Sequence, residues 1–177
     1  KTNPKAWYSL HRSREISLFE QEKIITPEIS LGTNMTYDES FMYHNTKCYT
    51  ITKRKNIIES YKFWLAILNS KLLWFYLNTT GYVLRGGYFT FNTKYLEPFP
   101  LPKLDNIELQ EPFVKEVDLI IENTKEFHDI LYSFTNYLQS QFVIEKLSKK
   151  LQNWYQLEFK EFIKELNKAI KKTENKK

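Results

Sequence analysis

The hydrophobic positions of this chain follow a strand-and-turn pattern over the first hundred residues and a helical repeat over the rest. Strands are predicted where β-branched and aromatic side chains gather, at residues 7–10, 23–29, 49–52 and 88–91. Residues 57–78 predict a helix, because apolar side chains recur at every third or fourth position on one face. Gly81 is expected to end this helix, since glycine is common just beyond a helix C-terminus.

From residue 113 onward the spacing of apolar side chains alternates between four and three, as in the seam of a coiled coil. This first seam consists of Phe113, Val117, Ile120, Thr124, Phe127, Leu131, Phe134 and Leu138. A second seam consists of Leu147, Leu151, Trp154, Tyr155, Phe159, Phe162, Leu166 and Ala169. We therefore expect two long helices that pack against each other or against another part of a larger protein. Residues 168–177 are expected to be frayed or to form a linker.

The two patterns together predict an α+β fold with a domain boundary near residue 102. Residues 1–102 are expected to form a small mixed sheet with short helices, closed by the proline-rich residues 98–102. Residues 103–177 are expected to form a long-helix module, and a helical hairpin would satisfy both seams. With 42% apolar residues, a chain of 177 residues can bury a packed core. Its start at Lys1, without a methionine, suggests a piece of a longer protein.

Charge is distributed unevenly between the two parts. Residues 1–100 hold 13 Lys and Arg against 8 Asp and Glu, whereas residues 101–177 hold 13 of each kind. The net charge of +5 therefore belongs entirely to the first part. Because an excess of positive charge favours a polyanionic partner, we expect the first part to face such a partner and the second to be a scaffold.

Sequence features of catalysis and cofactor binding are absent. The chain has neither GxGxxG nor GxxxxGK[ST], and its four glycines leave no glycine-rich phosphate loop. Its three histidines are far apart, and a single cysteine, Cys48, excludes an internal disulfide framework and a multi-cysteine zinc site. We therefore expect no catalytic residue, cofactor or metal site in this chain. The single cysteine fits a reducing cytoplasm, so we expect a cytoplasmic protein. No apolar run reaches the roughly 20 residues of a membrane span, so we expect no membrane contact.

Basic residues on expected turns and element ends are the candidates for contact with a nucleic acid. They are Arg12, Arg14, Lys23, Lys53, Arg54, Lys55, Arg85 and Lys94. Tyrosine and asparagine side chains are interleaved with them, and Arg, Lys and Asn contact phosphates or base edges in duplexes. Arg85 is followed by two glycines, which permit a close approach of the backbone to a partner. For any single candidate, a solvated basic rim around an ordinary turn is the alternative.

A family resemblance is carried by three segments, WYSLHRSREISLFEQEKIITPEIS (7–30), FWLAILNSKLLWFYL (63–77) and LRGGYFTFNTKYLEPFPLP (84–102). Their order resembles that of TaqI-like C-terminal specificity domains. These are the target recognition domains of adenine-specific methyltransferases and of fused type II restriction-modification enzymes. The most specific part is LNSKL followed by a strand and a YLExxPxP closure. Residues 147–166 are similar to the segment that follows this domain in large single-chain enzymes, so the resemblance covers about nine tenths of the chain.

The resemblance implies a division of labour within a longer restriction-modification enzyme. The recognition domain would grip double-stranded DNA and read its bases, while a methyltransferase core flips out the target adenine for N6-methylation. That core is expected to use S-adenosylmethionine, and the parent would also need Mg²⁺ if it cleaves DNA. This chain has no Asn-Pro-Pro-Tyr-type catalytic motif and no nuclease motif. Its expected partners are therefore the duplex and the methyltransferase or nuclease domains of the parent.

Two other functions stay open at the level of the sequence. The chain could be a fragment of a type I restriction specificity subunit, in which two recognition domains are separated by long helices. It could also be a helical protein–protein interaction module whose apolar seam contacts the partner. The charge asymmetry favours DNA recognition over such a module.

Overall fold

The computed structural model describes residues 15–174, and the chain divides into two compact units, Lys1–Asp118 and Leu119–Lys177. Each unit has a hydrophobic core of its own, and the division between them falls inside one long helix. The domain boundary expected near residue 102 precedes this helix and stays a prediction. The strand predicted at residues 7–10 and the candidates Arg12 and Arg14 lie outside the described residues.

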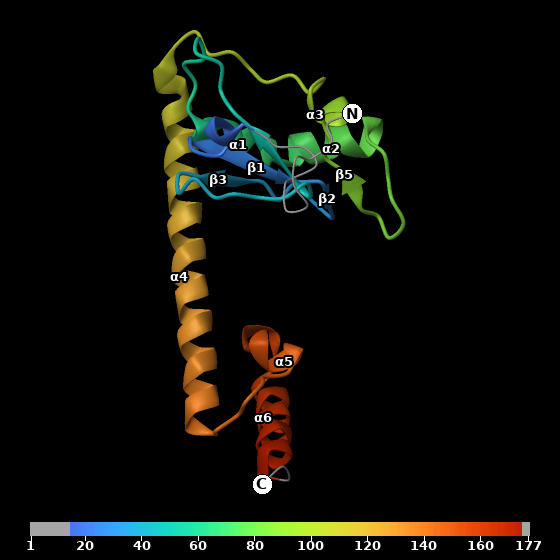
Figure 1. The fold of residues 1–177 in the computed structure, drawn as a ribbon, viewed down its shortest axis with the longest axis vertical. Coiled ribbons are helices and arrows are strands. Elements are labelled where there is room, and N and C mark those ends of the chain that lie inside the picture. The colour runs from blue at the N-terminus through green and yellow to red at the C-terminus, as the bar shows by residue number, and fades with distance from the viewer. Residues whose placement is uncertain (1–14, 175–177) are drawn as a thin grey trace, which may run out of the picture. The chain divides into compact units, whose positions relative to one another are not determined.

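The α+β class predicted from the sequence is confirmed by the order of helices and strands (Figure 1). The first unit contains η1 (Ile16–Leu18), β1 (Lys23–Pro27), β2 (Ile29–Ser30), β3 (Thr36–Asp38), β4 (Cys48–Ile51), α1 (Tyr61–Leu68), α2 (Lys71–Thr80), β5 (Phe89–Thr90), α3 (Thr93–Leu96) and η2 (Ile107–Gln110). The helix that continues into the second unit is α4 (Glu111–Gln141). It is followed there by α5 (Lys149–Gln152), η3 (Trp154–Gln156) and α6 (Phe159–Glu174).

Strands of the described residues form two small antiparallel sheets in place of the single mixed sheet that we expected. One sheet has the order β3-β1-β4, and the other pairs β2 with β5. At the centre of the first sheet, Ile24 on β1 lies opposite Tyr37 on β3 and Ile51 on β4. Its side chain is fully buried, so the central strand is anchored in the core of the unit.

Residues 57–78 contain two helices where the apolar periodicity predicts one. Helix α1 ends before Asn69, and Ser70 adopts an extended backbone and begins α2 by accepting a hydrogen bond from the Leu73 N–H. A serine in this position satisfies an N–H group that has no partner within the helix. Asn69 exchanges two hydrogen bonds of 2.9 Å with the backbone of Met35. The break between the helices is therefore tied to the loop that precedes β3.

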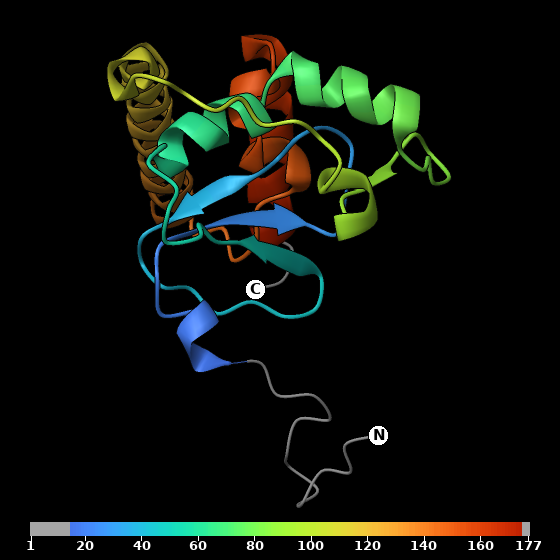
Figure 2. The same cartoon turned by 90° about the horizontal axis from the view of Figure 1, so that it is seen from above.

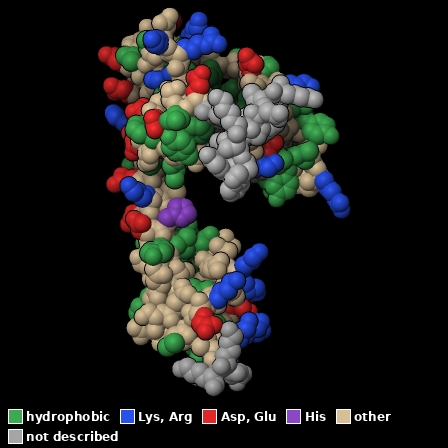
Figure 3. Space-filling model, viewed as in Figure 1, with side chains coloured by type: hydrophobic (Ala, Val, Ile, Leu, Met, Phe, Trp, Pro, Cys, Tyr) green, Lys and Arg blue, Asp and Glu red, His purple; other side chains and the backbone are tan. Residues whose placement is uncertain are grey.

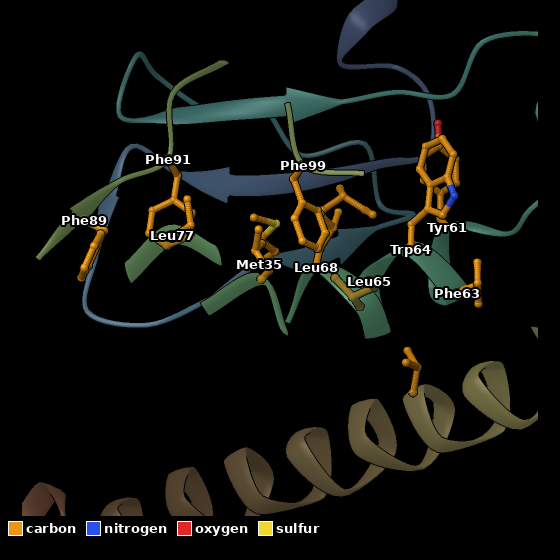
Figure 4. Packing of buried hydrophobic residues seen from close by; sticks show 13 residues of the cluster. Met35, Tyr61, Phe63, Trp64, Leu65, Leu68, Leu77, Phe89, Phe91 and Phe99 are labelled. Atoms are coloured by element: carbon orange, nitrogen blue, oxygen red, sulfur yellow. The ribbon is translucent and has the colours of Figure 1, made fainter. Parts of the chain in front are cut away.

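The core of the first unit lies between the sheets and the two helices α1 and α2. Its side chains come from strands, helices and the proline-rich closure, and Figure 4 shows among them Met35, Leu68, Leu77, Phe91 and Phe99. The first turns of α4 cover one side of this core. There Val117 is 5% exposed, and the Phe113 ring meets Phe63 edge-on with ring centres 5.3 Å apart. Burial of this apolar surface is the main force that holds the first unit together.

Two buried polar side chains fix the connection between the proline-rich closure and α4. Glu59 accepts a hydrogen bond of 3.0 Å from the Leu104 N–H, and Gln110 accepts one of 2.7 Å from the Ser60 N–H. The hydrogen bond from Leu104 is the largest influence on the Glu59 carboxyl and lowers its pKa. These contacts anchor both ends of the connecting segment to the residues that precede α1.

The core of the second unit forms where the end of α4 meets α5 and α6. Its buried members are Leu138, Ile144, Leu147, Leu151 and Leu166. Helix α4 is continuous over 31 residues, which confirms the helix predicted by the first seam. The middle of that seam is open within the described residues, since Ile120 is 61% exposed and Phe127 is 40% exposed.

The second seam is divided among α5, η3 and α6 and does not form one long helix. Asn153, between α5 and η3, has φ −106° and ψ 39°, values that interrupt the helical backbone. At the other end, residues 168–174 are helical, so the frayed segment predicted there is corrected over that range. Thr173 donates a hydrogen bond of 3.2 Å to the Ala169 carbonyl within this last part of α6.

Candidate nucleic-acid interface

The predicted Arg-Gly-Gly turn forms the tip of a hairpin between α2 and β5 (Figure 1). Val83 and Phe89 pair across this hairpin in a single antiparallel bridge. At the tip, Gly86 and Gly87 have φ values of 88° and 79°. Side-chain-bearing residues rarely adopt such left-handed values. The two glycines are therefore required by the backbone of the turn.

The base of the hairpin is held by packing. Phe89 is 4% exposed, and its ring meets Trp74 at 70° with ring centres 4.9 Å apart. Gly81 ends α2, which confirms the prediction, and its N–H donates to the Leu77 carbonyl at 2.8 Å. A Cβ added at Gly81 would lie 2.5 Å from that carbonyl oxygen and 3.2 Å from the Phe89 ring. Only glycine fits there, so the backbone that enters the hairpin has a fixed position.

The tip of the hairpin is open to solvent. Arg85 is exposed, and no carboxylate among residues 15–174 forms an ion pair with its guanidinium. Beside it, Tyr82, Val83 and Tyr88 are 57%, 52% and 44% exposed. A guanidinium can bind a phosphate or the two acceptors of a base edge, and aromatic rings can stack on bases. The tip thus combines the two kinds of side chain that nucleic-acid contacts use.

The basic loop after β4 is only partly available to a ligand. The Lys53 ammonium donates a hydrogen bond of 3.1 Å to the Glu59 carbonyl and lies 4.8 Å from the centre of the Tyr61 ring. The cation–π contact and the hydrogen bond hold this ammonium against the protein. Arg54 and Lys55 are exposed, so they are the members of the loop that can reach a partner.

Lys23 is a buried structural residue. Its side chain is fully buried, and its ammonium pairs with Asp38 at 2.5 Å and donates to the Phe19 carbonyl at 2.7 Å. Asp38 also accepts backbone hydrogen bonds from Ser40 at 3.0 Å and Met42 at 2.8 Å. Burial acts to raise the pKa of the Asp38 carboxyl, but the bonds from Lys23 and the two N–H groups outweigh it and lower that pKa. An enclosed ammonium cannot reach a phosphate, so the placement of Lys23 among the DNA contacts is corrected.

The remaining candidates do not form one continuous basic face. Figures 1 and 2 place the 52–60 loop and the 81–88 hairpin at opposite ends of the first unit. Lys94 is exposed on α3, which begins three residues after β5 and lies on the hairpin side in both views. Its ammonium lies 5.4 Å from the centre of the Tyr95 ring. The structure therefore groups Lys94 with the hairpin and separates both from the loop after β4.

Residues 15–174 contain no group of three His, Cys, Asp or Glu side chains in an arrangement that could hold a metal ion. None of the helices in that range is both long and apolar enough to cross a bilayer. His44 is engaged within the first unit, with Nε2 2.6 Å from the Thr50 hydroxyl and its ring against Phe19.

Comparison with known proteins finds relatives of both parts of the chain. The family model of the TaqI-like C-terminal specificity domain matches residues 3–101. A second family model, described as Domain of unknown function (DUF8810), matches residues 106–177. The Type II methyltransferase M.XhoI of Xanthomonas vasicola is 24% identical over 107 residues, which are 60% of this chain and 19% of that protein. The match thus spans about a fifth of the length of this curated relative.

Proposed function

Because the chain belongs to the family of TaqI-like C-terminal specificity domains, we propose that its first unit is the DNA target recognition domain of a restriction-modification enzyme. The resemblance seen in the sequence is confirmed by this match. In the proposed role the unit binds double-stranded DNA and directs N6-adenine methylation by catalytic domains outside these 177 residues. A parent that also cleaves DNA would use the same unit for both reactions. The relative named as a type II methyltransferase supports the assignment.

The observation that carries this proposal is an exposed Arg85 on a hairpin whose base is packed in the core. A preorganised loop loses little conformational freedom on binding. An arginine that contacts O6 and N7 of guanine is the commonest specific contact in the major groove. We assign Lys94, Arg54 and Lys55 to phosphate contacts, which position a protein on the duplex without reading its sequence.

The catalytic chemistry belongs, in this proposal, to the partner domains. S-adenosylmethionine would bind to the methyltransferase core of the parent, and Mg²⁺ to a nuclease domain in a parent that cleaves DNA. The match spans about a fifth of the methyltransferase relative, which is in keeping with a recognition segment inside a longer protein. The residues of this chain would bind and orient the duplex.

Selection of duplexes from a random pool tests the proposal. The 177-residue chain is used to enrich a preferred sequence, and its affinity for that duplex is compared with its affinity for unselected duplex. Arg85→Ala should reduce the discrimination between the two by about 1–3 kcal/mol, the usual value of one bidentate base contact. Arg85→Lys keeps the charge and loses the bidentate geometry, so it should lose discrimination and keep affinity for unselected duplex.

Lys71→Ala provides the matched control, because it also removes one exposed positive charge from the first unit. It should leave the discrimination unchanged. Failure of the wild-type chain to enrich any sequence would contradict the proposed function. Equal losses of discrimination in Lys71→Ala and Arg85→Ala would contradict the role of the hairpin.

A further inference from the structure

Half of the lysines of residues 142–174 line one groove of the second unit, although residues 101–177 are electrically neutral as a whole. Residues 142–174 carry eight lysines against five glutamates, whereas residues 119–141 carry one lysine against three carboxylates. Figure 3 shows a group of lysine side chains over α5 and α6. Positive charge is therefore in excess in residues 142–174 and negative charge in residues 119–141, although the net charge of residues 101–177 is zero.

Four of these lysines line one groove, with a volume of about 640 Å³, formed by α5, the turn before it and α6. They are Lys146, Lys149, Lys168 and Lys172, and all four are exposed. No ion pair in the described part of the chain involves any of them. Two glutamates also line this lysine groove, which leaves it an excess of two positive charges. Ser148, Gln152 and Thr173 add uncharged polar groups.

The local fold brings these lysines together. Ser148 begins α5 by accepting a hydrogen bond of 3.3 Å from the Leu151 N–H, and Leu151 is fully buried in the core of the unit. The short helix α5 is thereby fixed beside α6. On α6, Lys168 and Lys172 are four residues apart and share one face, an arrangement of like charges that disfavours a helix in isolation. An anion bound across the lysine groove would remove this repulsion.

We propose that the lysine groove is a second, sequence-independent contact with the phosphate backbone of double-stranded DNA. The inference rests on the proposed function, which already brings the first unit of the same chain to DNA. Lysine ammoniums bind phosphates as point charges, and serine, threonine and glutamine side chains commonly accompany them in contacts with the backbone. The lining contains no aromatic ring. Because single strands are bound by stacking their bases on such rings, the groove fits a duplex better.

Salt-dependent binding of the 177-residue chain to a random-sequence duplex of about 30 base pairs tests the proposal. The variant replaces all four groove lysines with glutamine. Each lost phosphate contact makes the slope of the logarithm of the association constant against the logarithm of the salt concentration less negative by about 0.9. We therefore expect a change in slope of about 3 to 4 and, at about 0.1 M salt, an affinity more than tenfold lower. All four side chains are exposed, so the variant should fold normally, which circular dichroism checks.

A matched variant carries glutamine at four lysines of the same unit that do not line the groove, Lys125, Lys160, Lys164 and Lys171. It removes the same charge and should change the slope by less than about one contact. Equal losses of duplex affinity in the two variants would overturn the proposal, because affinity would then depend on the total positive charge and not on where the lysines lie. An unchanged slope in the groove variant would overturn it as well.

Target recognition by the first unit and backbone binding by the lysine groove are refuted by different results. If the groove variant binds duplex like the wild type while Arg85→Ala loses discrimination, only the DNA-binding role of the lysine groove is refuted. If the wild type enriches no sequence while the groove variant loses affinity, target recognition is refuted and the backbone contact is supported. Vesicles of anionic phospholipid that bind with the same lysine dependence and compete with the duplex would make the groove a membrane contact and overturn the proposal.

Discussion

Replacing the buried Lys23 with methionine should destabilise the first unit by about 3–4 kcal/mol. The side chains of Lys23 and Asp38 are 0% and 3% exposed, so solvent screens the pair very little. Removal of one partner of such a pair costs roughly 3–5 kcal/mol, because the other charge stays buried without its counterion. Asp38 keeps the N–H donors of Ser40 and Met42, which places the expected loss at the lower end of that range.

Urea unfolding followed by circular dichroism measures this loss. In a unit of this size 1 kcal/mol shifts the thermal midpoint by roughly 4 °C, so in a thermal melt the midpoint of the first unit should fall by about 12–16 °C. The double variant Lys23→Met/Asp38→Leu removes both charges and should recover most of the lost stability. A loss below about 1 kcal/mol in Lys23→Met would refute the reasoning, because the pair would then be effectively solvated.

The pH dependence of the same variant gives an independent check. The folded-state pKa of Asp38 lies below its ordinary value of 3.8. Its contribution to stability is therefore complete above that value and is lost as the pH falls through the lowered folded-state pKa. The difference in unfolding free energy between wild type and Lys23→Met should be full at about pH 7 and shrink below about pH 4. A difference that stays constant down to about pH 2 would contradict the ion pair.

Three further variants probe the hairpin, the second core and a partly buried tyrosine, Tyr37. Gly81→Ala should cost about 1–3 kcal/mol in urea unfolding, because its Cβ would lie 2.5 Å from the Leu77 carbonyl oxygen; a neutral result would contradict the fixed hairpin base. Leu151→Ala should lower the stability of the second unit by about 2–5 kcal/mol and leave the first unit unchanged, since their cores are separate; a single shared transition in calorimetry would contradict this. Burial, and after it Glu22, raises the pKa of Tyr37 to about 12. Ultraviolet titration of Tyr37→Phe should therefore lack one late-ionising tyrosine, and this group makes wild-type stability fall as the pH rises from about 10 to 12.

Apolar periodicity predicted the long helix α4, and clusters of β-branched and aromatic residues predicted β1, β4 and β5 but not β3. Periodicity could not predict the break between α1 and α2. Periodicity records which face of an element is buried, and the apolar positions of residues 57–78 run through the break without a change. The break depends on a serine cap and on the hydrogen bonds between Asn69 and Met35. Met35 is 34 positions away in the sequence, so this contact exists only once the unit has folded.

The same limit applies to the candidate DNA contacts. Lys23 and Arg85 were equally good candidates in the sequence, because Lys23 begins one predicted strand and Arg85 comes shortly before another. Lys23 lies opposite Asp38 in the β1–β3 ladder, and that pairing is set by the register of the sheet. Arg85 differs because the two glycines beside it are a local signal of an exposed turn. The lysine groove was hidden for another reason, since a charge total does not record which helix face each charge occupies.

The hairpin separates the residues that hold it from the residues that could read a sequence. Phe89 and Gly81 fix its base, whereas the side chains around Arg85 are exposed. Substitutions of the exposed side chains at the tip should therefore cost little folding stability, whereas Gly86 and Gly87 keep the turn. New recognition preferences could then arise by mutation of Tyr82, Val83, Arg85 or Tyr88 without a prior stabilising mutation elsewhere. In evolutionary terms, such a division would let one scaffold diversify among enzymes with different targets, and it would let an engineer exchange the tip alone.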